Sequence, residues 1–281
     1  MNERTTKPVI LLAFANSSAN PLPNLATECN RLTAILEAAA KKGICELVVR
    51  PYATVDQLLG IFEQTDLQGR ITVFHYAGHA DSYRLLLEGA DGQPALAHAG
   101  GLAALLRYQH GLQLVFLNGC STQAQAQELL AAGVNVVIAT SLAIDDQVAT
   151  AFAAHFYTAL ANLDSIEVAF GKAQAAVQTT HGSETRHLYL VGAPQTVATD
   201  RWPWALYQRP DTPNAGQWTL SDAATTKRLP FEPATVLIPA GPFLMGSPPA
   251  PGIPPHETPV WIKRQLGIKR LQERMYTVYR W

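Results

Sequence analysis

The sequence predicts an α/β fold, with a mostly parallel sheet flanked by helices. Apolar runs of strand length alternate with segments of helical periodicity, beginning with a strand at 8–15, a helix at 25–42 and a strand at 45–49. These runs lack the polar alternation of half-exposed strands, which is typical of strands buried on both faces. Strands separated by helices need crossover connections, and such connections make neighbouring strands parallel.

The alternation continues to about residue 191 and then stops. We expect further strands at 71–76, 85–87, 112–117, 134–140 and 187–191, and helices at 55–62, 99–107, 123–132, 147–160 and 166–179. Thr54 is a suitable N-cap for the helix that follows it. After Pro194 the chain becomes rich in Pro, Gly, Thr and Trp, without helical periodicity. We therefore predict a domain over 1–195, a linker over 196–233 and an irregular extension over 234–281.

Composition narrows the class of protein. The 281 residues are 48% hydrophobic and carry a net charge of −1, which disfavours a general nucleic-acid or anionic-membrane binder. The three cysteines, Cys29, Cys45 and Cys120, fit free thiols in a reducing compartment. The apolar run at 9–15 is too short and strand-like for a secretory leader, and the run at 134–144 is too short to span a bilayer. We expect a soluble, cytoplasmic protein without a membrane span.

Two of the predicted strands end in sequences that can carry chemistry. The third ends in Gly78-His79, and the fourth ends in Gly119-Cys120. In an open parallel sheet, binding and catalytic groups gather beyond the carboxyl ends of the strands. A glycine before each candidate residue lets the backbone turn sharply and leaves room for a substrate chain. The sequence therefore predicts that His79 and Cys120 form one site.

This pairing of residue types suits acyl transfer. Cys120 precedes the helix at 123–132, and the positive end of a helix dipole favours a thiolate. His79 would take the thiol proton and later protonate the leaving amine. The backbone N–H groups of Ala80 and Cys120 are the expected oxyanion donors. The predicted reaction is attack on a peptide carbonyl, formation of an acyl-enzyme and hydrolysis.

Cysteine and histidine residues also have structural roles in most proteins. A lone cysteine or histidine is usually a small buried residue or a satisfied polar group, so the joint pattern carries the prediction. His75 lies within its strand and is expected to support the site or the core, while Cys29 and Cys45 are expected to be structural. Neither metal-ligand spacing nor a phosphate-binding loop is present, so we expect no metal and no cofactor.

The phrase FHYAGHA, followed by VFLNGCST, resembles the CHAT family of bacterial caspase-like peptidases. The opening VILLAFANSSANPLPNLATECNRLTAILE, the segment VNVVIATSLAIDDQVATAFAAHFYTAL and the phrase LYLVGAP extend the resemblance over about residues 8–195. The resemblance implies a caspase-hemoglobinase fold and an endopeptidase with a dyad of His79 and Cys120. It also implies a protein substrate, and a role in bacterial signalling or defence in which a sensor or partner protein releases the activity.

The resemblance bears on the substrate pocket as well. Many relatives with arginine specificity carry an acid two residues before the cysteine, where this chain has Asn118. Asp145 and Asp146 match an acidic loop of the family, and they would line the pocket or bind an activating ion. Equally, Asp146 could cap the helix that follows it.

The predicted extension has a second resemblance. Residues 234–259 resemble the opening of a formylglycine-generating-enzyme (sulfatase-modifying factor) domain, but the segment is short and holds no cysteine, so we assign it no activity. Residues 261–281 are basic, which indicates a solvated face or a docking tail.

Three functions remain open at this point. The first is an active cysteine endopeptidase. The second is a catalytically silent caspase-like signalling module, which the amide at Asn118 favours. The third is a nucleotide- or small-molecule-binding α/β domain, which would need a glycine-rich strand-to-helix turn; the first such turn, at 16–23, has no glycine.

Overall fold

The computed structural model describes residues 7–16, 20–89, 94–181 and 202–222. Its centre is a six-stranded sheet of order β2-β1-β3-β6-β7-β8. The strands are β1 (Val9–Ala15), β2 (Glu46–Arg50), β3 (Ile71–Gly78), β6 (Leu114–Asn118), β7 (Val136–Thr140) and β8 (Trp204–Gln208). All neighbours in this sheet are parallel except β7 and β8, which are antiparallel. The predicted α/β fold with a mostly parallel sheet is confirmed.

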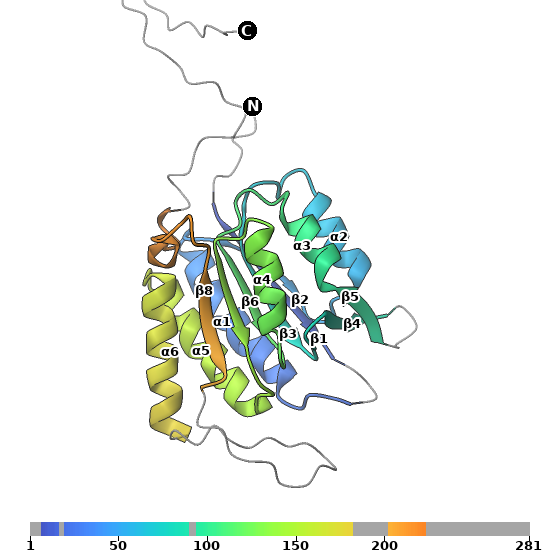
Figure 1. Ribbon diagram of the computed structural model, residues 1–281. Helices are drawn as coiled ribbons and strands as arrows, with labels where there is room; N and C mark the ends of the chain where they lie inside the picture. The colour runs from blue at the N-terminus through green and yellow to red at the C-terminus, as the bar shows by residue number, and fades with distance from the viewer. Residues whose placement is uncertain (1–6, 17–19, 90–93, 182–201, 223–281) are drawn as a thin grey trace, which may run out of the picture. The chain divides into compact units, whose positions relative to one another are not determined.

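Helices cover both faces of the sheet (Figure 1). One face carries α1 (Leu25–Lys41), α5 (Asp146–Ala161) and α6 (Ile166–His181), and the other carries α2 (Val55–Glu63), α3 (Ala99–Leu106) and α4 (Gln123–Ala131). Successive strand residues face opposite sides, so Ile10 and Leu12 pack with α1 and α5, while Leu11 and Ala13 pack on the other side. The strands are apolar throughout because both of their faces are buried.

A hairpin follows β3 and lies outside the main sheet. It consists of β4 (Arg84–Glu88) and β5 (Pro94–His98), which pair antiparallel. Leu85 and Leu87 of β4 are buried, which confirms the short strand expected at 85–87. The sequence did not predict β5, whose side chains are at most half-buried and whose first residue is a proline.

The sheet extends further along the chain than the sequence indicated. Residues 196–233 were expected to be a linker, but they contain β8 and a short 3₁₀ turn at Ala215–Gln217. The ring of Trp204 stacks on Phe152 of α5 with centroids 4.5 Å apart, so this strand is packed against the core. The strand expected at 187–191 and the extension over 234–281 lie outside the described residues. Within the described residues, no helix is long and apolar enough to cross a membrane.

The pairing of β3 with β6 sets the position of the two candidate catalytic residues. The last pair in this parallel ladder joins Ala77 to Asn118. Extending the register by two residues along both strands brings His79 and Cys120 to the same level, just beyond the carboxyl edge of the sheet. Because β3 and β6 are neighbours in the sheet, the residues that follow them lie at the same edge of it.

We expect Thr54→Ala to lower the free energy of unfolding by about 1 kcal/mol, because it removes a capping box. The Thr54 hydroxyl accepts the Gln57 N–H at 3.2 Å, and the Gln57 side chain accepts the Thr54 N–H at 3.3 Å. Thr54→Ser keeps the hydroxyl and should stay within a few tenths of a kcal/mol of wild type. Urea unfolding measures both variants, and an equal loss in the two would contradict the role of the cap.

Candidate active site

The loops that carry His79 and Cys120 are in backbone contact. A Cβ atom added at Gly119 would lie 2.8 Å from the Gly78 carbonyl oxygen and 2.9 Å from the Ala80 Cβ. A Cβ at Gly78 would lie 2.5 Å from the Ala15 carbonyl oxygen. Such separations are far below van der Waals contact, so only glycine fits at either position. Gly119 thus permits the close approach of the two loops, while Gly78 permits the approach of β3 to the end of β1.

The imidazole of His79 is oriented by a backbone carbonyl. Its Nε2 lies 2.6 Å from the carbonyl oxygen of Asn20. A carbonyl oxygen can only accept, so Nε2 carries a proton, and in the neutral imidazole Nδ1 is then the nitrogen with a free lone pair. Among the described residues, Nδ1 has no hydrogen-bond partner. In this tautomer, Nδ1 is the ring nitrogen that can accept a hydrogen bond.

Side chains from two elements, β3 and α4, hold the loop around His79. The hydroxyl of Tyr76 lies 2.6 Å from the His79 carbonyl oxygen and 2.7 Å from that of Leu86. Burial raises the pKa of Tyr76, so its hydroxyl stays protonated and available as a donor. From α4, Gln125 donates to the carbonyl oxygen of Asp81 at 2.6 Å. The loop that carries the histidine is thus tied to the helix that follows the cysteine.

A salt bridge closes the next turn of this loop. Both carboxylate oxygens of Asp81 accept bonds: Oδ1 from the N–H groups of Tyr83 and Arg84, and Oδ2 from the Arg84 guanidinium at 2.7 and 3.0 Å. The Arg84 side chain, followed by the Tyr83 amide, holds the pKa of Asp81 below its usual value. This turn carries the chain from His79 into β4.

Cys120 is half-buried and lies in a tight turn between β6 and α4. Ser121, the next residue, has φ = 55°, a left-handed conformation that costs a non-glycine residue about 1 kcal/mol. The buried hydroxyls of Thr122 and Thr140 hold this turn against the end of β7. Thr122 Oγ1 accepts the Thr140 N–H at 3.0 Å, and Thr140 Oγ1 donates to the Gly119 carbonyl oxygen. The helix itself begins at Gln123, as the sequence predicted.

Two backbone amides beside the glycine contact have no partner among the described residues: those of Ala80 and Cys120. Ala80 faces Leu85 between two bonds of the β4 pairing, Leu86 N–H to the His79 carbonyl at 2.9 Å and Asp81 N–H to the Arg84 carbonyl at 3.0 Å. In an antiparallel pairing, the residue between two such bonds points its own N–H away from the partner strand. Ala80 N also lies 3.7 Å from the Cβ position of Gly119.

A cluster of buried polar side chains lies beneath the site. Glu28 of α1, 1% exposed, accepts the Asn118 side-chain N–H at 2.8 Å and lies 3.3 Å from Nε2 of His75. The orientation of that second contact is not that of a hydrogen bond, and the neighbouring Tyr157 hydroxyl has no partner among the described residues. Burial, followed by the Glu28 charge, raises the pKa of Tyr157 well above its ordinary value. Trp204 donates to the Asn118 carboxamide oxygen at 3.2 Å. As expected, His75 belongs to the core.

The three residues predicted to line a substrate pocket have different surroundings. Asn118 is 4% exposed, and Glu28 and Trp204 occupy its carboxamide. Asp145 is the N-cap of α5 and accepts the N–H groups of the second and third helix residues. Asp146 accepts the Asn24 N–H at 2.6 Å instead of capping the helix. Burial raises the pKa of Asp146, although the Asn24 bonds oppose this shift. The pocket role of the three residues stays a prediction.

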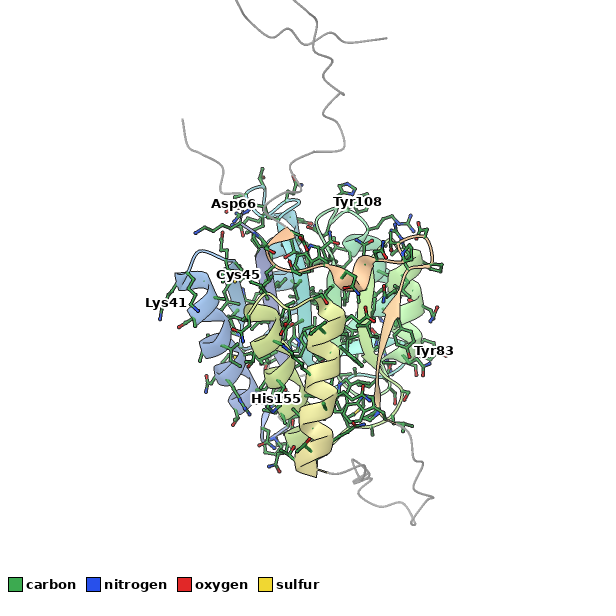
Figure 2. All side chains as sticks on the ribbon, turned by 90° about the vertical axis from the view of Figure 1, so that its left-hand side faces the viewer. Lys41, Cys45, Asp66, Tyr83, Tyr108 and His155 are labelled. Atoms are coloured by element: carbon green, nitrogen blue, oxygen red, sulfur yellow. The ribbon has the colours of Figure 1, made fainter. Side chains whose placement is uncertain are left out.

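The other two cysteines are buried and unpaired. Burial raises the pKa of Cys29, and it raises the pKa of Cys45 to about 11. Cys45 lies near Lys41, toward the same end of the molecule as Asp66 (Figure 2). The burial of Cys29 and Cys45 agrees with the structural role expected for them. Within the described residues, no group of three His, Cys, Asp or Glu side chains could hold a metal ion.

Sequence reasoning missed four residues that shape this site: Asn20, Tyr76, Gln125 and Thr140. Asn20 acts through its backbone, which leaves no mark in the side-chain pattern. Tyr76 and Thr140 are polar side chains in otherwise apolar strands, and this mismatch was visible in the sequence. Gln125 lies among other glutamines in its helix, so the sequence does not mark it. A buried polar group needs a partner, so such a mismatch is a signal that can be searched for.

Comparison with protein families matches residues 2–227 to the CHAT domain. This match covers most of the chain, which therefore belongs to the CHAT family. It also extends past residue 195, where the resemblance read from the sequence ended, and it includes β8. No comparison supports the resemblance of residues 234–259 to a formylglycine-generating enzyme. No match was found among curated proteins.

Two solved structures resemble the described fold. One is a secreted C11 cysteine protease from Bacteroides thetaiotaomicron in complex with an irreversible peptide inhibitor, at 13% identity and a TM-score of 0.47 over 62% of this chain and 59% of that one. The other is the Arg-specific cysteine proteinase gingipain R, at 12% identity and a TM-score of 0.45 over 63% of this chain and 43% of that one. The matched region thus spans about half the length of these structures.

The contact between His79 and the Asn20 carbonyl predicts the tautomer of the imidazole. In its neutral form, His79 should carry its proton on Nε2, which is seen in a long-range ¹H–¹⁵N correlation spectrum. The signal is assigned by its loss in His79→Gln. A neutral His79 protonated on Nδ1 would contradict the orientation described here.

The three thiols should differ in reactivity. At pH 7.5 we expect iodoacetamide to alkylate Cys120 in the native protein, and Cys29 and Cys45 only after denaturation. A raised pKa lowers the thiolate fraction at a given pH, and burial blocks access as well. Peptide mass spectrometry gives the extent of alkylation at each cysteine, with urea-unfolded protein as the reference. Equal rates for the three native thiols would refute the difference.

Proposed function

We propose that this CHAT protein is a cysteine endopeptidase that hydrolyses peptide bonds of a protein substrate, with Cys120 as nucleophile and His79 as its base. One observation carries the proposal: the backbone contact of Gly119 with Gly78 and Ala80. This contact brings together a half-buried thiol, an imidazole with a free Nδ1 and two unpaired amides. These are the parts that acyl transfer needs.

In the first half of the reaction, the Cys120 thiol gives its proton to Nδ1 of His79, and the thiolate attacks the peptide carbonyl carbon. The carbonyl oxygen becomes an oxyanion, which accepts the N–H groups of Cys120 and Ala80. His79 then passes the proton to the leaving amine. The C–N bond breaks, and a thioester joins the acyl half of the substrate to Cys120. Throughout, the Asn20 carbonyl keeps the imidazole in position through Nε2.

In the second half, a water molecule gives a proton to His79 Nδ1 and attacks the thioester carbonyl. The same two amides hold the second oxyanion. The C–S bond then breaks, the thiol is restored with the proton from His79, and the acyl product leaves as a carboxylic acid. The net change is the addition of one water molecule across the peptide bond.

We further propose that the protein acts in the cytoplasm, in bacterial signalling or defence, where a sensor or partner protein controls its activity. Three free cysteines support a reducing compartment. The net charge of −1 supports a protein partner over nucleic acid. For recognition of the substrate, Asn118, Asp145 and Asp146 remain the candidates near the ends of β6 and β7. In this proposal, Asn118 contributes to the floor of the pocket.

Cleavage of a mixed-sequence peptide library by the purified chain, with and without calcium, tests the function. Cys120→Ala and His79→Ala should each lower cleavage by about 10³-fold or more, because the two residues act as one unit. The matched controls are Cys45→Ala, a buried thiol, and His110→Ala, an exposed histidine before β6. Both should retain activity.

The outcomes separate the alternatives. If either dyad variant, still folded, cleaves at the wild-type rate, the proposed dyad is wrong. If wild type shows no cleavage and its Cys120 alkylates no faster than an ordinary exposed thiol, the catalytically silent signalling module replaces the peptidase.

A further inference from the structure

We propose that Thr140, at the end of β7, is a positioning residue that aims the Cys120 N–H at the substrate's oxyanion. The inference rests on the proposed function and adds a residue that neither the sequence nor the CHAT match assigns. Thr140 does not touch the substrate. It acts through the peptide unit that joins Gly119 to Cys120.

The argument begins with the Thr140 hydroxyl. Thr140 is fully buried, and its Oγ1 donates to the carbonyl oxygen of Gly119. Its own backbone N–H donates to Thr122 Oγ1 at 3.0 Å, which fixes the end of β7 against the turn. The Thr122 N–H approaches Thr140 Oγ1 at 3.4 Å, so the hydroxyl receives one bond and gives its proton to Gly119. The hydrogen bond from Thr140, at the end of β7, therefore sets the direction of the Gly119 carbonyl.

A trans peptide unit transmits this direction to Cys120. The C=O of one residue and the N–H of the next lie in one plane and point opposite ways, and there is no cis peptide bond among the described residues. With the Gly119 carbonyl turned toward Thr140, the Cys120 N–H points away from β7. On that other side of β6 lies β3, with the Ala80 amide 3.7 Å from the Cβ position of Gly119. Both proposed oxyanion donors are thus on the same side.

The peptide unit after Cys120 is held from β7 as well. The Ser121 N–H donates to the Leu142 carbonyl oxygen at 3.4 Å, two residues beyond Thr140. Ser121 keeps its left-handed φ of 55° under this constraint. The end of β7 therefore fixes the peptide units on both sides of Cys120 and leaves the cysteine's own N–H unpaired. A donor that is oriented before the reaction need not reorganise when the oxyanion forms, and this is the source of its catalytic value.

This role predicts an effect on the transition state rather than on substrate binding. The oxyanion carries its full charge only after attack, so a misdirected Cys120 N–H should lower kcat and leave KM nearly unchanged. Thr140→Val keeps the shape of the side chain and removes the hydroxyl. We expect its kcat to fall about 10- to 100-fold, less than the 10²- to 10³-fold typical of losing an oxyanion donor altogether.

The test compares Thr140→Val with Thr140→Ser and Thr72→Val in the full chain, on the library peptide that wild type cleaves best. Thr140→Ser retains the hydroxyl and should restore kcat to within a few-fold of wild type. Thr72→Val is the matched control, because Thr72 is a buried threonine at the amino end of β3 that donates to the Val9 carbonyl at 3.3 Å. It should not change kcat.

Two thiol reagents separate positioning from general damage. A peptide aldehyde built on the same sequence adds the Cys120 sulfur to its carbonyl carbon, and the aldehyde oxygen becomes an oxyanion-like group. Thr140→Val should weaken this inhibitor about as much as it lowers kcat. Iodoacetamide alkylates the same sulfur with loss of iodide and forms no oxyanion, so its rate should stay within about twofold of wild type.

Each outcome decides the inference. It is overturned if Thr140→Val has wild-type kcat and aldehyde affinity, or if Thr140→Ser fails to restore them. Equal loss of aldehyde affinity and of alkylation rate would show a disturbed site and would also overturn it. If wild type itself neither cleaves peptides nor binds the aldehyde, the proposed function fails, and the inference fails with it.

Discussion

The parallel pairing of β3 with β6 is the constraint on which the rest of the site depends. Parallel neighbours end at the same edge of a sheet, so a residue that follows one strand meets a residue that follows the other. Here the meeting is so close that the backbone of Gly119 lies against Gly78 and Ala80, where a side chain would not fit. The parallel pairing of β3 with β6 therefore places a thiol, an imidazole and two free amides together at one edge of the sheet.

A buried polar cluster supports this edge from within the core. Asn118, the last residue of β6, joins Glu28 of α1 to Trp204 of β8 through its carboxamide. Burying a carboxylate is costly unless it is paired or hydrogen-bonded, and truncating one partner leaves the others uncompensated. The cluster therefore links three distant parts of the chain at the residue that precedes Gly119 and Cys120. This buried cluster supports the turn in which Ser121 adopts its left-handed φ of 55°.

The sequence predicted the elements in which apolar periodicity is continuous, and it placed His79 and Cys120 at adjoining strand ends. It missed β5 and β8, because a proline begins the first and a Pro- and Trp-rich stretch surrounds the second, and both are short. It missed Asn20 and Thr140 for a different reason. Thr140 stands out as a polar residue in an apolar strand, but its contact with the Gly119 carbonyl, like that of the Asn20 carbonyl with His79, depends on tertiary structure that no local pattern encodes. Local pattern thus predicted the candidate residues, and the fold determines how they are oriented.

The late position of β8 in the chain has a consequence for the order of assembly. Ser141, in the loop that follows β7, donates its N–H to the Pro203 carbonyl at 2.9 Å, and Trp204 reaches Asn118 across 86 residues of sequence. Contacts of such long range form late in folding, and a chain being synthesised releases this strand only after His79 and Cys120 have emerged. The turn around Cys120 therefore lacks the supports that depend on β8 until that strand docks. A nascent chain would therefore pass through most of its folding with the candidate site only partly supported.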